Sequence, residues 1–149
     1  MAIVRVIVGA LIGIGYGLLV GVVTFRLMQL TYDPRYPGAM IPDAAGWARI
    51  ITFFAAVITG FLGALVGIAV GLARVGTSGG AVIGVSAGVG LFLVFTIWDF
   101  SSYWSSLEQE PSHVSSILLS HLAIFFVAFV LGLPLVGLVT GFINSKLSG

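Results

Sequence analysis

A run of apolar residues with regularly spaced glycines constrains the fold of this chain more than any other feature of the sequence. The run covers about residues 6–25, which is long enough at about 1.5 Å per residue to cross the roughly 30 Å hydrocarbon core of a bilayer. Glycine recurs in it at every fourth position, at Gly9, Gly13, Gly17 and Gly21. Because residues four apart share one face of a helix, we expect a groove against which another helix packs closely.

Three more apolar runs follow, at about residues 50–72, 80–98 and 116–142. With the first run, they predict an all-α membrane protein whose four transmembrane helices form one transmembrane domain over residues 1–149. Only 7% of the residues are charged and 59% are hydrophobic, so the chain lacks the charged surface that a soluble domain needs. The further glycines that we expect to form helix-packing faces of the glycine-zipper type are Gly63, Gly67, Gly71, Gly80, Gly84, Gly88, Gly137 and Gly141.

Three of the glycine-rich segments resemble one another. GALIGIGYG at residues 9–17 aligns with GALVGIAVG at residues 63–71 and with GAVIGVSAG at residues 80–88. The spacing suggests two tandem helical hairpins with the same orientation in the membrane. The small alphabet of Gly, Ala, Val, Ile and Leu also produces such matches by chance, so duplication and coincidence both stay open.

The basic residues give little guidance on orientation because they divide equally between the two sides of the membrane. Arg5, Arg74 and Lys146 lie on one side, and Arg26, Arg35 and Arg49 lie on the other. The short link between the second and third runs and the arginine-free connection at residues 99–112 favour cytoplasmic termini. We expect a multi-pass protein of the bacterial cytoplasmic (inner) membrane.

Pro134 lies in the middle of the fourth run, between Gly132 and Gly137. Its ring nitrogen carries no hydrogen and cannot donate to the carbonyl of Val130. We therefore expect the helix to kink at Pro134 and to use it as a hinge.

Two charged residues end apolar runs at equivalent positions of the suggested repeat. Arg26 follows the first run, and Asp99 follows the third. Both should lie on the same side of the membrane at similar depth, so we predict that they form an ion pair, within the chain or with a neighbouring subunit. The alternative is that each side chain reaches the interface independently.

His121 stands near the start of the fourth run. A neutral imidazole at this depth can bind the iron of haem or the magnesium of chlorophyll, or hydrogen-bond a quinone. The alternative is an interfacial histidine that is satisfied by water, a lipid headgroup or a backbone carbonyl. Because no other run carries a matching histidine, we predict no cofactor and keep haem or chlorophyll at His121 as the alternative.

The remaining sequence features exclude several classes of function. The chain has no cysteine and a net charge of +1, so it offers no thiolate site and no electrostatic basis for binding nucleic acid. No spacing typical of catalytic residues or of a protein metal site appears, and we expect no enzymatic activity and no metal site. The glycine ladders resemble those of rotary-ATPase proteolipid subunits, but the mid-helix carboxylate of that family has no counterpart in the second and fourth runs.

These observations favour a non-catalytic accessory subunit of a larger membrane protein complex, respiratory or photosynthetic. Its partners would be other integral membrane subunits and membrane lipids. A small homo-oligomeric channel or transporter is one alternative, and a pigment- or haem-binding subunit that uses His121 is another.

Overall fold

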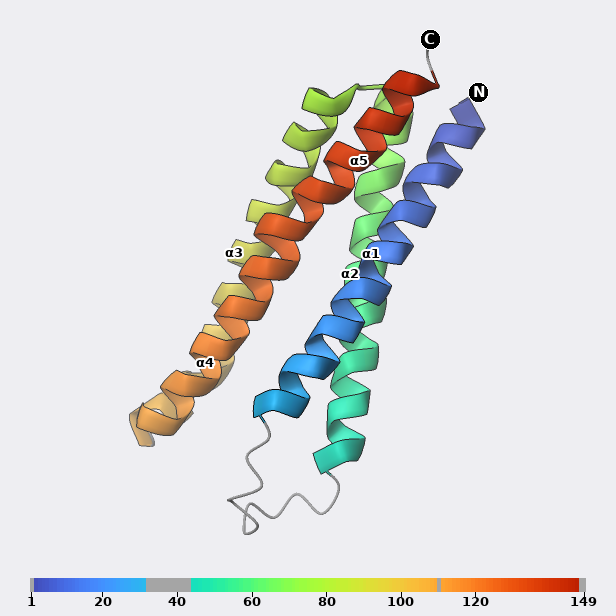
Figure 1. Cartoon of the computed structure of the whole chain (residues 1–149). Helices are drawn as coiled ribbons and strands as arrows, with labels where there is room; N and C mark the ends of the chain where they lie inside the picture. The colour runs from blue at the N-terminus through green and yellow to red at the C-terminus, as the bar shows by residue number, and fades with distance from the viewer. Residues whose placement is uncertain (1, 32–43, 110, 148–149) are drawn as a thin grey trace.

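The computed structural model describes residues 2–31, 44–109 and 111–147, and every element in these ranges is a helix (Figure 1). The elements are α1 (Ala2–Thr31), α2 (Ala44–Ala73), α3 (Thr77–Gln109), α4 (Pro111–Phe125), the π-helix η1 (Phe126–Gly132) and α5 (Leu133–Lys146). Because α4, η1 and α5 follow one another directly, they form one long rod. Four stretches are long and apolar enough to cross a membrane: Ala2–Arg26, Thr52–Ala73, Thr77–Trp104 and His121–Lys146. The predicted fold class, with four membrane-spanning helices, is therefore confirmed.

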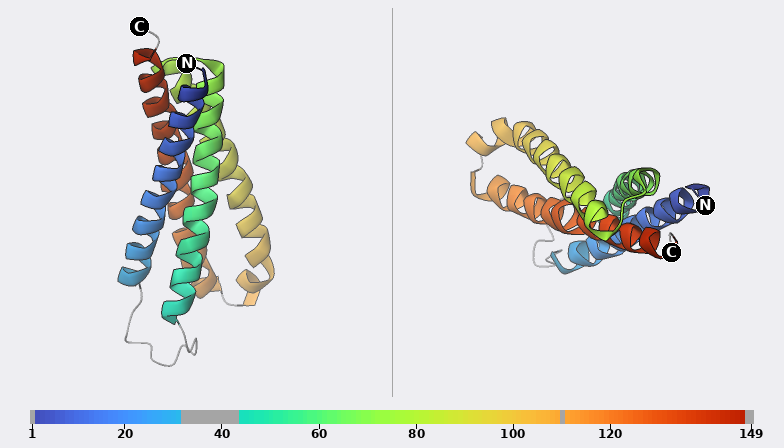
Figure 2. Two further views of the ribbon diagram at one scale, coloured as in Figure 1. Left: turned by 90° about the vertical axis from the view of Figure 1, so that its right-hand side faces the viewer. Right: turned by 90° about the horizontal axis from the view of Figure 1, so that it is seen from above.

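The helices form two hairpins that lie side by side. In the first hairpin α1 packs along α2, and in the second α3 packs against α4, η1 and α5. Seen from above, α5 lies between α3 and the first hairpin (Figure 2), and it contacts both α1 and α2. The two chain termini lie at the same end of the molecule, and the hairpins diverge toward the opposite end (Figure 1).

The third helix is longer than the sequence suggested. We expected the span to stop at Asp99 and a polar loop to follow over residues 99–112, but α3 continues to Gln109. The hydroxyls of Ser101 and Ser102 donate to the carbonyl of Trp98, at 2.9 and 2.8 Å, so these polar side chains are satisfied within the helix. No proline or glycine interrupts the segment before Pro111, and the helix therefore extends beyond the apolar run.

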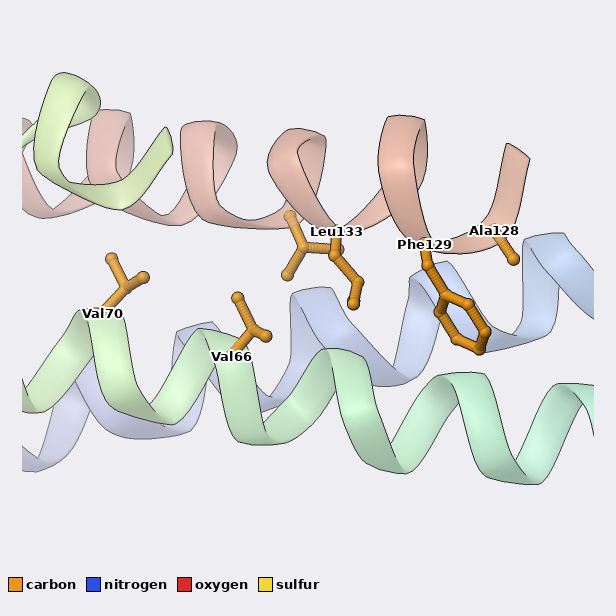
Figure 3. Close-up of a cluster of buried hydrophobic side chains, with 6 residues drawn as sticks. Val66, Val70, Ala128, Phe129 and Leu133 are labelled. Carbon is orange, nitrogen blue, oxygen red and sulfur yellow. The ribbon is translucent and has the colours of Figure 1, made fainter. Parts of the chain in front are cut away.

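The hydrophobic core lies between the two hairpins (Figure 3). Val66 and Val70 of α2 pack there with Ala128, Phe129, Leu133 and Val136 of the last rod. Val70 and Leu133 are completely buried. Most other large apolar side chains point outward: Leu18 of α1 and Phe61 of α2 are each 64% exposed. Apolar side chains on the outside as well as in the core are what a helix bundle in lipid requires.

Candidate functional site

The backbones of α1 and α2 are in direct contact along a row of glycines. A Cβ atom added to most of the facing glycines would overlap the backbone of the opposite helix; Gly60 is the exception, since a Cβ there would lie 3.5 Å from Cα of Gly17, an ordinary contact. The facing pairs are Gly9 with Gly67, Gly13 with Gly63 and Gly17 with Gly60. At the two ends of this row, a Cβ on Gly21 would lie 2.7 Å from Cβ of Ala56, and one on Gly71 would lie 3.0 Å from the carbonyl oxygen of Arg5. Where a Cβ would overlap the opposite backbone, as at Gly9, Gly13 and Gly67, only glycine lets the two backbones approach so closely.

The second hairpin has fewer glycine–glycine pairs. Gly80 faces Gly137, and Gly141 faces the backbone of Gly76, which lies directly before α3. Gly84 and Gly88 face the backbone of larger residues on the opposite rod, Leu133 and Phe129. In this hairpin the glycines of α3 form the groove, while the opposite rod keeps its large side chains for contact with the first hairpin.

Tyr16 of α1 connects the first hairpin to the π-helix. Its hydroxyl donates to the carbonyl oxygen of Ala128, and its ring fills the space in which Gly132 lacks a side chain. If the wide π-helical turn continued, the N–H of Leu133 would donate to the carbonyl oxygen of Ala128. It donates to the carbonyl oxygen of Phe129 instead. Tyr16 therefore hydrogen-bonds a carbonyl at the junction between η1 and α5.

The π-helix ends at Gly132, two residues before Pro134, which occupies the first turn of α5. An α-helix at this point would bring the proline ring against the carbonyl four residues earlier, and a wider turn relieves that clash. The sequence predicted a kink here, and the structure has a π-helical segment of 7 residues. The hinge at Pro134 stays a prediction.

Two further polar contacts join the hairpins near the termini. The side-chain amide of Asn144, which is 2% exposed, donates to the carbonyl oxygen of Val70 at 3.1 Å. Arg5 Nη2 lies 3.5 Å from the carbonyl oxygen of Leu147. The sequence analysis did not single out Tyr16 or Asn144 as site residues. For Tyr16 the available signal was a polar side chain inside an apolar run, which does not say which backbone group that side chain reaches. Asn144 lies just beyond the fourth run and carried no such signal.

Asp99 and His121 form a bonded pair between α3 and α4. Nδ1 of His121 lies 3.0 Å from both carboxylate oxygens of Asp99. The Asp99 side chain is 12% exposed and that of His121 is 35% exposed. The partner found for Asp99 is therefore His121, where the sequence predicted Arg26. Arg26 belongs to α1, in the other hairpin, and the two hairpins diverge toward this end of the molecule (Figure 1).

Aromatic rings lie near His121, and an apolar groove lies beside Asp99. The rings of Tyr103 and Phe125 lie 6.0 and 6.2 Å from the His121 ring. A shallow groove beside the pair is lined by Asp99, Thr96 and Phe100 of α3 and by Leu118, Leu119, Leu122 and Phe125 of α4. The buried hydroxyl of Thr96 has no hydrogen-bond partner among the described residues. The Asp99 carboxylate is the charged group of an otherwise apolar groove.

Within residues 2–31, 44–109 and 111–147, no three His, Cys, Asp or Glu side chains lie close enough together to hold a metal ion. Comparisons with protein-family models, with curated proteins and with solved structures each find no match. The arrangement of these side chains is therefore the basis for any statement about function.

Replacing Gly13 by alanine should destabilise the first hairpin because the added methyl group would overlap the Gly63 backbone. We expect a loss of about 1–3 kcal/mol, the usual cost of overpacking. Gly15→Ala is the matched control, since nothing lies within 4 Å of a Cβ at Gly15. Thermal unfolding of both variants in detergent, followed by circular dichroism, measures the difference. Equal midpoints for the two variants would contradict the backbone contact.

Replacing Tyr16 by phenylalanine should weaken the contact between the hairpins while keeping the ring against Gly132. The loss should be about 1 kcal/mol, in the range of interhelical hydrogen bonds in membranes. Thr59→Val is the control, because the Thr59 hydroxyl donates to Ala55 of its own helix, at 2.6 Å. Unfolding by denaturant in mixed micelles compares the two. If Tyr16→Phe is no more destabilising than the control, the hydroxyl does not join the hairpins.

Proposed function

We propose that this chain is a non-catalytic accessory subunit of a larger membrane protein complex, to which it contributes helix-packing surface. Its internal polar groups support this role. The side chains of Tyr16 and Asn144 donate to carbonyls of other helices, and that of Thr59 donates within its own helix. These groups stabilise the bundle.

The observation that carries the proposal is the apolar character of the outward faces. Large apolar side chains are exposed on all four membrane-spanning helices, and on α2 they include Phe53, Phe54 and Phe61. Gly15 and Gly90 are exposed between such side chains, with nothing within 4 Å of a Cβ at either position. Outward faces with this composition suit lipid and the helices of neighbouring subunits, because small residues let another backbone approach.

A homo-oligomeric channel or transporter is less well supported. Such a protein needs a path lined by polar groups or backbone carbonyls. The space between the two hairpins is filled by the core side chains of Val66, Val70, Phe129 and Leu133 (Figure 3). A path would therefore have to form between copies of the chain, across outward faces that are apolar.

Both termini lie at one end of the molecule (Figure 1), so one assignment of sidedness applies to both. We assign that end to the cytoplasmic side of a bacterial inner membrane. An energy-transducing complex, respiratory or photosynthetic, is the host that we propose.

Native mass spectrometry of the particle purified from its own membranes in a mild detergent tests the proposal. We expect one or a fixed number of copies of this chain together with other integral membrane chains in constant stoichiometry. A particle that contains only copies of this chain would refute the accessory role.

Site-specific photo-crosslinking shows whether the outward faces make these contacts. A photoreactive residue at Phe61, which is 64% exposed, should label another chain of the particle. The same residue at Val70, which is fully buried, should label only this chain and serves as the control. If Phe61 and other outward positions on all four membrane-spanning helices label only lipid, the outward faces do not contact other subunits.

A further inference from the structure

The bond between Asp99 and His121 determines which ring nitrogen carries a proton. A carboxylate only accepts hydrogen bonds, so the nitrogen that lies 3.0 Å from both of its oxygens must donate. Nδ1 of His121 is therefore the protonated nitrogen. In the neutral imidazole, Nε2 then carries the lone pair.

Nε2 of this ring is available to a ligand. Among the described residues, Nε2 has no hydrogen-bond partner, and the His121 side chain is 35% exposed. A histidine that binds a metal through one nitrogen usually donates the other N–H to a carboxylate or carbonyl, which holds the ring and makes the ligating nitrogen more basic. Asp99 occupies the position of that carboxylate.

A single imidazole limits the kind of metal that can bind here. A bare ion needs several protein ligands, and the described residues place no third metal-ligating side chain near this pair. A metal that already sits in a macrocycle needs only one or two axial ligands. The chemistry of the pair therefore suits a metal-bearing tetrapyrrole rather than a free ion.

The surroundings of His121 also fit a flat apolar ligand. Asp99 lies on α3 about 33 Å beyond Thr77, at about 1.5 Å per residue, and thus near the far boundary of the hydrocarbon core. The exposed Trp98 and Trp104 are typical of that boundary. The rings of Tyr103 and Phe125 lie near the imidazole, and two of its neighbours, Asp99 and Phe125, also line the apolar groove between α3 and α4. A macrocycle bound here would contact lipid and aromatic rings, with any acidic groups at the headgroups.

From this geometry we propose that His121 is an axial ligand for a metal-bearing tetrapyrrole, and that Asp99 is the residue that positions its ring. The proposal goes beyond the accessory role and does not depend on it. A subunit that binds no macrocycle can still be accessory, and a chain that forms no complex can still bind one.

Titration of the purified chain in detergent with ferric protoporphyrin IX, followed by its absorption spectrum, tests the proposal. We expect saturable binding of one macrocycle per chain with a shifted Soret band. His121→Ala should abolish the shift, and added imidazole should restore it by taking the place of the missing ligand. Asp99→Asn should weaken binding roughly 10- to 100-fold, the usual effect of removing the residue that orients a ligand. His113→Ala, which removes the other histidine of the chain, is the matched control and should bind like the native protein.

A parallel titration with magnesium protoporphyrin IX separates a haem from a chlorophyll-like ligand, and binding of either one through His121 supports the proposal. Circular dichroism of each variant shows whether it is folded. Absence of a saturable shift with both macrocycles, or equal binding by folded His121→Ala, overturns the proposal. In that case the pair only joins α3 to α4, and Asp99→Asn changes the unfolding midpoint without any effect on the macrocycle.

Discussion

The structure depends on how closely two helix backbones can approach in lipid. Lipid tails are as apolar as the side chains that face them, so helices gain little from burying apolar surface and associate through packing. The pairs Gly9–Gly67 and Gly13–Gly63 bring the α1 and α2 backbones into direct contact. Because glycine supplies that contact, the larger residues of both helices are free to face the core or the membrane.

The second hairpin uses the same principle, with glycine on both helices at Gly80 and Gly137 and on α3 alone further along. Gly84 and Gly88 of α3 accept the backbone of Leu133 and Phe129, whose side chains point to the other hairpin and form the core. The π-helix belongs to this arrangement, because it accommodates Pro134 and presents the carbonyl of Ala128 to Tyr16. One contact between the hairpins thus combines three features: the glycines of α3, the wide turn of η1 and Tyr16 of α1.

The sequence predicts the four spans and the fold class because apolar length and low charge are properties of single segments. The sequence does not predict where α3 ends. Ser101 and Ser102 are typical of loops, but in the structure their hydroxyls donate to a carbonyl of the helix itself. The sequence also predicted that Asp99 pairs with Arg26. That prediction rested on equivalent depth in a suggested repeat, which says nothing about the angle between the hairpins. The Asp99–His121 pair depends on the register of α4 against α3, which no local pattern encodes.

The two ends of the molecule are held together differently, and this difference bears on where a ligand or partner can act. At the end with the termini, Asn144 bonds Val70 and Arg5 reaches Leu147, so each hairpin is tied to the other. At the opposite end α4 packs chiefly on α3, away from the first hairpin, and Asp99 bonds His121 across that contact. A carboxylate and an imidazole at the edge of the membrane cost more free energy than an apolar contact unless both groups are satisfied. The packing of α4 on α3 does not by itself require such a pair, so helix packing alone does not account for it.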